Sequence, residues 1–579
     1  MFKNKPYFFS RLTIAFIVCA SVLLVWFFRW EDDKYLYIVD GDGADYYSYL
    51  VSIFINQDLG AQDLSPWYII PTATGTINVH PLGVSLLLSP FFGIGYICST
   101  IIDADLNGLS EPFLKMVSVG ALFYLTLGLY FLRRLLAEFN FSDKVIAITL
   151  LLVFFGTNLL NYAIIEPSMA HVYSFAMISA FLFYAKKLFA QFSRKHLYLA
   201  ALLFALVILI RPVNGIIIFT LPFLAGSFSN FKTVLAAFFR DKRALIVSAL
   251  IFFSVLFIQS AVWYAQNGQF IQWSYKGNGF YFSDPHTWLM LFGFDSGFFI
   301  YTPLCLLVLL GLIPLFKENR FRFWILSGFL AFSFYLFSCY WGYTYFDGLG
   351  IRTFVDYYAL FAVLLAMLLT YIAKKWIKFM AVPALMSASL ISLVFCFQYQ
   401  AGILPAAGMN YNKFRYIFLN TDESYAGVLG GCMDLAPYAD ADTPPEMIYS
   451  SDQKQAVDLK DTEYGLLNDI NPLKISSNKL YVKISLERKE EALNSSQEAM
   501  VVVHLQKENG ESKSYQAFKI NEVPADTCCA WEAFNYRVTI ADKVVPGDKL
   551  GIYIWNKAKQ SFSIQNFNVE VYNYNFKTS

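Results

Sequence analysis

Charged residues are scarce in this chain of 579 residues, where they make up 15% of the sequence, against about 25% in typical soluble proteins. Hydrophobic residues make up 57% and aromatic residues 18%. Lysine and arginine together number 44 and aspartate and glutamate 43, so there is no bulk positive field for nucleic acid. The composition excludes a strongly basic nucleic-acid-binding protein and indicates a membrane protein.

Common cofactor motifs are also missing from the sequence. The eight cysteines include no CxxC spacing, which argues against a zinc site or a redox motif. No glycine-rich phosphate-binding loop is present either. A disulfide between Cys432 and Cys528 or Cys529 and a set of free thiols are both compatible with the spacing. Internal repeats and low-complexity linkers are absent as well.

Long apolar runs fill residues 11–400. The first run, 12–30, follows Lys3, Lys5 and Arg11 and has no small-residue cleavage site after it, so we expect an uncleaved first helix with a cytoplasmic N-terminus. Together the runs predict about eleven transmembrane helices, some shorter than the roughly 20 residues that a crossing needs. The further runs are 113–132, 145–160, 171–185, 197–210, 213–226, 244–264, 298–316, 323–340, 354–373 and 379–397.

Basic clusters occupy every second connection between these runs, and the other connections have almost no lysine or arginine. The clusters are Arg133-Arg134 with Lys144, Lys186-Lys187 with Arg194-Lys195, Lys232 with Arg240, Lys242 and Arg243, Lys317 with Arg320 and Arg322, and Lys374-Lys375 with Lys378. This is a positive-inside pattern, and it requires that residues 82–102 do not cross. We therefore predict one long outside loop over 31–112, with an in-plane interfacial helix at 82–102.

The last part of the chain reads like an ordinary soluble domain. An odd number of crossings places everything after Tyr399 outside the cytoplasm, in the periplasm or at the cell exterior of a bacterium. Short alternating runs with turn signals between them predict a β-sandwich over 430–579, joined to the membrane domain 1–400 by a connector, 401–429. The predicted strands are 480–486, 500–505, 515–520, 535–540, 549–555 and 562–574.

Three carboxylates, Asp40, Asp42 and Asp45, lie within six positions soon after the first apolar run. Glycines between them allow a tight turn that leaves the carboxylates uncrowded. Such groups can accept a proton from an attacking hydroxyl or bind a divalent cation. A solvated turn is the alternative, and the membrane context favours a catalytic loop at the membrane surface.

Two further polar stretches border predicted helices. His80, before Pro81, can hydrogen-bond a phosphate or a sugar hydroxyl, or it simply precedes a helix that starts at proline. Glu166 and His171 lie in a short connection without basic residues. They are candidates for supporting groups or metal ligands, with loop solvation and helix capping as the alternative. They do not by themselves define a metal site.

Arg211 and Arg352 are isolated cations at the outer ends of apolar runs. A charge placed there usually has a partner because desolvation is costly, and a guanidinium can bind phosphate bidentately. We expect both to hold a substrate phosphate, with snorkelling to lipid headgroups as the alternative. Lys276 and the aromatic loop 273–288 are candidates for covering the site.

With these residues in place, the chain resembles the GT-C superfamily of integral membrane glycosyltransferases, in particular bacterial members with protein-mannosyltransferase-like membrane halves. The resemblance covers roughly residues 1–400. The Asp-Glu pair typical of protein mannosyltransferases is absent. The matching stretches are Asp40-Gly41-Asp42-Gly43-Ala44-Asp45-Tyr46-Tyr47, His80-Pro81-Leu82-Gly83, Ser168-Met169-Ala170-His171-Val172-Tyr173-Ser174-Phe175, Arg211-Pro212, and Trp341-Gly342 with Gly350-Ile351-Arg352.

The resemblance implies transfer of a sugar from a polyprenyl-phosphate donor to an acceptor outside the cytoplasm (a glycan, a lipid or a protein). It implies a base in the first outside loop, for which Asp42 fits best and Asp40 and Asp45 are alternates, and the C-terminal domain looks like a carbohydrate-binding module. Inversion is the predicted outcome. A transporter or flippase for lipid-linked sugars is the main alternative, and a glycan-binding assembly protein is a third.

Overall fold

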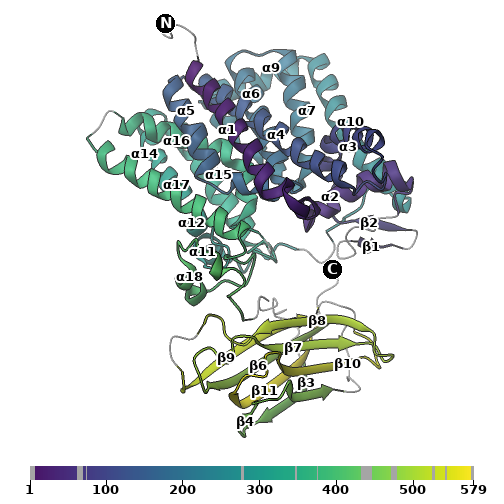
Figure 1. Cartoon of the computed structure of the whole chain (residues 1–579). Coiled ribbons are helices and arrows are strands. Elements are labelled where there is room, and N and C mark those ends of the chain that lie inside the picture. Colours follow the sequence, from purple (N-terminus) through teal and green to yellow (C-terminus); the bar gives the residue numbers. More distant parts are fainter. Residues whose placement is uncertain are drawn as a thin grey trace. The chain divides into compact units, whose positions relative to one another are not determined.

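The computed structural model describes residues 7–60, 69–72, 75–275, 279–345, 348–373, 376–431, 446–470, 479–524, 528–540 and 544–574. The chain divides into two compact units, one of residues 1–292 and 296–396 and the other of residues 293–295 and 397–579. The first unit is helical apart from a hairpin of β1 (Ile69–Pro71) and β2 (Thr76–Asn78), and the second contains the other strands and the short helix α18 (Tyr411–Ile417) (Figure 1).

Eight helices in the described part of the chain are long and apolar enough to cross a membrane, and a pair bent by 117°, Pro212–Ala225 with Phe228–Arg240, makes a ninth candidate. The predicted membrane character is thus confirmed, but the count of about eleven is not. The helices of this unit are α1 (Phe8–Val25), α2 (Asp42–Val51), α3 (Gly83–Ile101), α4 (Glu111–Glu138), α5 (Asp143–Phe155), α6 (His171–Ala190), α7 (Arg194–Ile210), α8 (Leu221–Ala225), α9 (Phe228–Arg240), α10 (Lys242–Asn267), α11 (Thr287–Phe292), α12 (Phe298–Tyr301), α13 (Pro303–Val308), α14 (Leu312–Glu318), α15 (Arg320–Ser338), α16 (Tyr358–Ile372) and α17 (Lys378–Gln400).

Two of the predicted spans are interrupted for visible reasons. The run 298–316 breaks into α12, α13 and α14, and the first break falls before Pro303, which cannot continue the preceding helix. The run 145–160 forms α5 of 13 residues, which ends at Gly156. A Cβ atom at Gly156 would lie 2.6 Å from the side chains of Leu304 and Ser389, so glycine permits this close packing.

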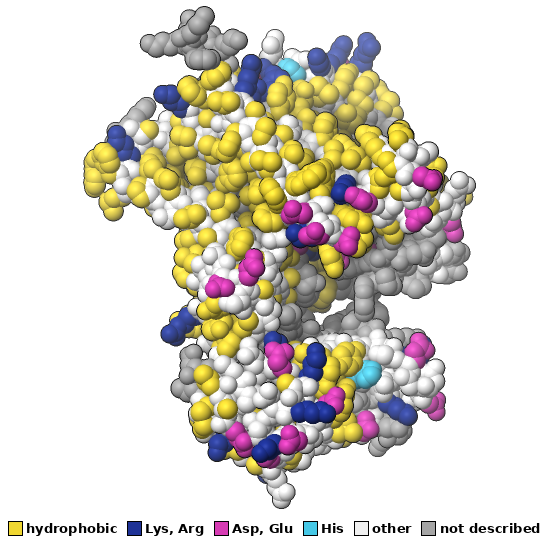
Figure 2. Space-filling model, in the orientation of Figure 1, with side chains coloured by type: hydrophobic (Ala, Val, Ile, Leu, Met, Phe, Trp, Pro, Cys, Tyr) yellow, Lys and Arg dark blue, Asp and Glu magenta, His cyan; other side chains and the backbone are white. Residues whose placement is uncertain are grey.

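The basic connections lie together at one end of the helical unit. Lys187 at the end of α6 lies 3.1 Å from Glu138 at the end of α4, and Arg194 at the start of α7 lies 2.7 Å from Asp241, just before α10. Figure 2 shows lysine and arginine side chains along this end and acidic side chains toward the other. Lys374 and Lys375 lie outside the described residues.

Helix α3, the predicted in-plane helix, is long and apolar enough to be counted among the eight candidate spans. It runs beside only the first half of α4. Gly95 faces Phe113, and the Tyr124 hydroxyl donates to the carbonyl of Leu87. Its in-plane placement stays a prediction.

The second unit is a β-sheet domain with two antiparallel sheets, ordered β5-β10-β7-β8 and β3-β11-β6-β9, with β4 paired to β11. The six predicted strands are present, and β3, β4 and β5 were not predicted. Glycines with positive φ, Gly510 (88°) and Gly547 (99°), form the predicted turns. The strands are β3 (Glu446–Gln453), β4 (Val457–Asp458), β5 (Tyr464–Ile470), β6 (Lys479–Glu490), β7 (Ala499–Gln506), β8 (Ser512–Lys519), β9 (Trp531–Ile540), β10 (Lys549–Asn556) and β11 (Phe562–Tyr574).

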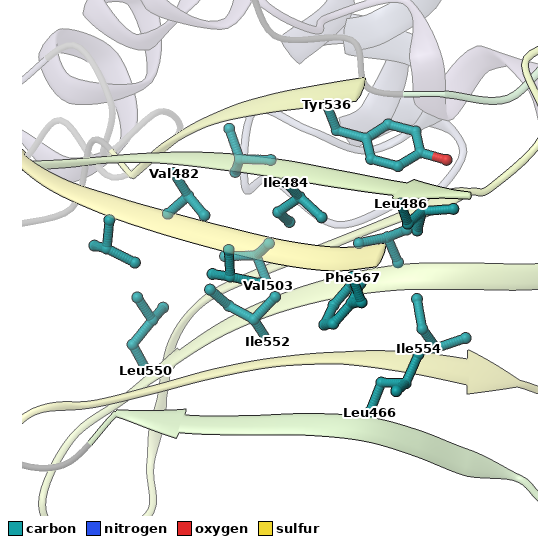
Figure 3. Close-up of a cluster of buried hydrophobic side chains, with 14 of the residues drawn as sticks. Leu466, Val482, Ile484, Leu486, Val503, Tyr536, Leu550, Ile552, Ile554 and Phe567 are labelled. Carbon is teal, nitrogen blue, oxygen red and sulfur yellow. The ribbon is translucent and has the colours of Figure 1, made fainter. Parts of the chain in front are cut away.

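Both sheets bury side chains in one hydrophobic cluster, because alternate residues of each strand point inward. Figure 3 shows Val482 and Ile484 of β6 close to Val503 of β7 and Ile552 of β10. The sandwich arrangement itself stays a prediction. Cys528 and Cys529 are free and exposed, and Cys432, the other half of the predicted disulfide, lies outside the described residues.

Candidate functional site

A cavity of about 640 Å³ lies in the helical unit, toward the ends of the helices that are opposite the basic connections. Its wall is formed by the starts of α2 and α6, the end of α7, the later part of α10 and the end of α15. The first residue of the 3₁₀ helix Arg352–Tyr357, which precedes α16, completes it. Five of the residues singled out from the sequence lie on this wall: Asp42, His80, His171, Arg211 and Arg352.

Asp42 and Arg352, which are 310 residues apart in the chain, form an ion pair on the cavity wall. Asp42 is the first residue of α2 and follows Gly41. The φ of Gly41 is 53°, a backbone conformation that glycine adopts more readily than other residues. Its Oδ2 accepts a hydrogen bond of 2.6 Å from Nη2 of Arg352. The Asp42 side chain keeps 19% of its surface exposed and the Arg352 side chain 10%, so the pair is accessible from the cavity.

The charge of Asp42 is stabilised in this position. Burial on its own raises the pKa of the Asp42 carboxyl, but the positive charge of Arg352, with smaller contributions from other cavity groups, outweighs burial and holds the pKa below its ordinary value. The carboxylate is therefore ionised throughout the neutral range and accepts protons only weakly while Arg352 is its partner.

This shift predicts how the stability contributed by the pair depends on pH. Because the folded-state pKa of Asp42 is depressed, the contribution is present above the pKa of an unfolded aspartate, about 3.9, and is lost as the pH falls through the folded-state value. The difference in thermal midpoint between wild type and Asp42→Asn should be constant from pH 8 to pH 5 and shrink below pH 4. A difference that already narrows between pH 7 and pH 5 contradicts this assignment.

Asp45 and His80 form a second contact between a buried carboxylate and a cavity residue. Asp45 lies one turn after Asp42 on α2 and is 2% exposed. Its Oδ2 is 2.8 Å from Nδ1 of His80, and the Asn78 side chain donates to the Asp45 carbonyl. The His80 ring packs on Tyr46 with centroids 4.8 Å apart. The carboxylate fixes the ring orientation, as such partners do for functional histidines.

A third carboxylate, Asp356, holds two of the predicted residues and was missed in the sequence. Asp356 is fully buried and lies just before α16. It accepts from Nη1 of Arg211 at 2.8 Å and from Nδ2 of Asn214 at 2.7 Å, and its other oxygen is 2.9 Å from Nδ1 of His171. An ionisable residue inside the predicted run 354–373 was the available signal, since such residues usually have a functional partner.

The structure does not bring all predicted residues to the cavity. Asp40 is exposed, and its Oδ1 accepts from the backbone N–H of Gly41. Glu166 accepts a hydrogen bond from the Asn161 side chain at 3.0 Å. The described cavity wall includes neither Asp40 nor Glu166. Among the residues that the structure describes, no group of three or more His, Cys, Asp or Glu residues is arranged to hold a metal ion.

Aromatic and aliphatic side chains form the rest of the wall. The loop predicted to cover the site supplies Trp273 and Tyr275, and Lys276 lies outside the described residues. A few polar groups in a largely apolar cavity are typical of small-molecule sites. Other large side chains on the wall include Tyr46, Met169, Ile208, Leu209, Leu256, Trp263, Phe280, Leu336, Phe337, Tyr340, Trp341 and Tyr345.

Comparisons with known structures give partial similarities, among them an oligosaccharyltransferase and an arabinofuranosidase. No family model and no curated protein matches the chain. An Archaeoglobus fulgidus oligosaccharyltransferase, solved with zinc and sulfate, is similar over 75% of this chain and 58% of its own length, with 14% identity and a TM-score of 0.37. An arabinose-bound α-L-arabinofuranosidase is similar over 24% of this chain and 21% of its own length, with 16% identity and a TM-score of 0.14. Similarities at this level do not establish a fold or an activity.

Proposed function

We propose that this protein is an integral membrane glycosyltransferase that transfers a monosaccharide from a polyprenyl-phosphate donor to an extracytoplasmic glycan, lipid or protein. One observation carries the proposal: a carboxylate, two guanidinium groups and two imidazoles converge on a single cavity of a helical membrane unit. The GT-C-like stretches of the sequence contribute all five residues, which is consistent with the resemblance.

The two arginines have different roles in this proposal. Arg211 is held by Asp356, which is fully buried and accepts two further contacts, so this pair stays closed. Arg352 is held by Asp42, a partly exposed carboxylate at a helix start, so this pair can open. The donor phosphate displaces Asp42 from Arg352, because a guanidinium binds phosphate through two parallel hydrogen bonds. Arg211 and His80 complete the binding of the phosphate.

The released carboxylate then serves as the base. With the sugar between them, Asp42 and Arg352 lie on opposite faces of the anomeric carbon. The acceptor hydroxyl oxygen forms the new bond to that carbon, its proton goes to Asp42, and the bond to the phosphate oxygen breaks with its electron pair leaving on polyprenyl phosphate. Arg352 stabilises the growing charge on the phosphate, and attack from the opposite face inverts the configuration.

The walls fit the two ends of such a donor. The side chains of Ile208, Leu209 and Leu256 are suited to the isoprenoid chain, and the aromatic residues Trp273 and Tyr340 on the same wall are suited to contact the sugar. The cavity lies at the end opposite the basic connections, which by the positive-inside rule supports a site outside the cytoplasm. We propose a bacterial inner membrane location, with the N-terminus cytoplasmic and the β-sheet domain periplasmic and carbohydrate-binding.

One observation favours the alternative, a transporter or flippase of lipid-linked sugars. Arg211 and Asp356 form a pair within the helical unit, and both lie where regular α-helix gives way to a 3₁₀ helix. Such charged pairs at broken helices are also typical of transporter sites. The two functions differ in their products, since only a transferase cleaves the bond between sugar and phosphate.

The test uses purified full-length protein with a panel of polyprenyl-phosphate sugars and candidate acceptors. The proposal expects release of free polyprenyl phosphate that depends on intact protein and on an acceptor. Intact donor that moves between the leaflets of proteoliposomes without any release of polyprenyl phosphate supports the flippase and overturns the transferase.

A further inference from the structure

A second cavity, of about 750 Å³, lies at the basic end of the helical unit, away from the proposed active site. It is formed between the first turns of α1 and the last turns of α4. Its lining includes the guanidinium groups of Arg11, Arg133 and Arg134, the rings of Tyr7 and Tyr130, and the side chain of Glu138.

Arg133 is buried although it is an arginine near the end of α4. It is only 7% exposed, and its Nε has no hydrogen-bond partner in the described part of the chain. Its guanidinium lies over the rings of Tyr7 and Tyr130, at 5.4 and 5.6 Å from their centroids. Burying a guanidinium is costly unless its donors and its charge are matched. The rings compensate part of that cost and leave an unused donor.

The charges of the three arginines are not balanced by the protein around them. No carboxylate of the described residues lies within ion-pair distance of any of the three guanidinium groups. Glu138, the acidic residue on the wall, pairs with Lys187 at 3.1 Å. Asp143, near the start of α1, accepts from the backbone N–H groups of Phe9 and Ser10. The sequence of residues 1–6 adds two lysines and no acid.

General membrane rules explain only part of this cluster. Positive residues are enriched at cytoplasmic helix ends, and cations are stabilised at helix C-termini. The first rule suits Arg11, which is exposed and lies in the first turn of α1. Both rules suit Arg134, which lies near the end of α4 and whose Nη1 donates to the Tyr130 hydroxyl at 3.0 Å. Neither rule requires a third guanidinium to be buried with an unpaired donor in a cavity. An anion in the cavity balances the charge of these guanidinium groups.

We propose that this cavity binds the phosphate group of an anionic phospholipid. A phosphate matches the planar donor array of guanidinium groups. The neighbouring surface of α1 is apolar and exposed, with Phe9 at 48%, Leu12 at 57% and Phe16 at 56% exposure, and provides a path for acyl chains beside the headgroup. The site is independent of the proposed transferase activity, since it shares no residue with the active-site cavity.

The test measures thermal unfolding of the full-length, delipidated protein in detergent during titration with short-chain phosphatidylglycerol, phosphatidylcholine or inorganic phosphate. Ligands that bind the folded state raise its unfolding midpoint. Phosphatidylglycerol should raise the midpoint and phosphatidylcholine should not. Arg133→Gln should weaken the apparent affinity for phosphatidylglycerol by about tenfold, the loss of one charge-assisted contact.

Lys144→Gln is the matched control, because Lys144 lies at the same end, beside Phe9 of α1, but outside the cavity lining. It should retain the wild-type response. If Arg133→Gln does not fold, Arg11→Gln and Arg134→Gln replace it and should also weaken the apparent affinity for phosphatidylglycerol. An equal response to both lipids, or an equal loss in Lys144→Gln, overturns the proposal. If inorganic phosphate raises the midpoint as much as phosphatidylglycerol does, the assignment of the bound phosphate to a lipid is wrong.

Discussion

Asp42→Asn is expected to lower the kcat of sugar transfer by about 10²–10⁴-fold, the usual contribution of a general base. Donor affinity should be unchanged or higher. The reason lies in the ion pair: the asparagine cannot accept the acceptor proton, and it no longer holds Arg352, whose Nη2 is 2.6 Å from the Asp42 carboxylate in the free protein. The donor phosphate then meets a guanidinium that does not have to be released first.

The measurement separates kcat from the donor KM in a release assay for polyprenyl phosphate and adds direct donor binding. Asp40→Asn is the matched control, because Asp40 lies two residues away, is exposed, and is not on the described cavity wall. It should keep wild-type kinetics. Equal losses in the two variants, or a loss in Asp42→Asn that is entirely in donor binding, contradict a base role for Asp42.

The sequence could not distinguish among the three aspartates of the first loop, because spacing alone does not say where a helix begins. The observed helix begins at Asp42, a start that the spacing of the aspartates and glycines did not predict. Asp42 and Asp45 therefore lie one turn apart on the same side of α2, one facing Arg352 and the other His80, while Asp40 stays outside the helix. Local backbone geometry decides their roles.

The sequence also could not show which charged residues pair with each other when they are far apart in the chain. Desolvation cost indicated that Arg211 and Arg352 need partners, but those partners are Asp356 and Asp42, 145 and 310 residues distant in the chain. Asp356 was overlooked because the run around it is otherwise apolar. A single sequence shows that a buried charge needs a counterion and does not show which one the fold supplies.

The secondary structure could be predicted where the pattern of side chains matches the burial. Strand β10 alternates strictly between buried and half-buried residues and was predicted from 549 to 555. Strand β3 has no buried residue along its length, so its sequence carries no alternation and it was missed. In the helical unit the apolar runs indicated helices, but breaks such as the one before Pro303 reduced the number of full spans.

Asp356→Asn is expected to have the largest effect on stability of any single change at the site. The substitution keeps the shape of the side chain but leaves the Arg211 charge without its counterion, and it turns an amide N–H₂ toward groups that are themselves donors. Breaking a buried pair in this way costs about 3–5 kcal/mol. Transfer activity should fall as well, because the contacts that orient Arg211 and His171 toward the cavity are lost.

Tyr357→Phe provides the comparison within the same network. It removes one neutral hydrogen bond, from the Tyr357 hydroxyl to Oδ1 of Asn214 at 2.9 Å, which is worth about 1 kcal/mol. Thermal unfolding of the full-length protein in detergent should therefore show a decrease in midpoint several times larger for Asp356→Asn than for Tyr357→Phe. If the two decreases are equal, the charge of Asp356 does not hold Arg211. Its assignment as the fixed counterion, and with it the distinct roles of the two arginines, is then wrong.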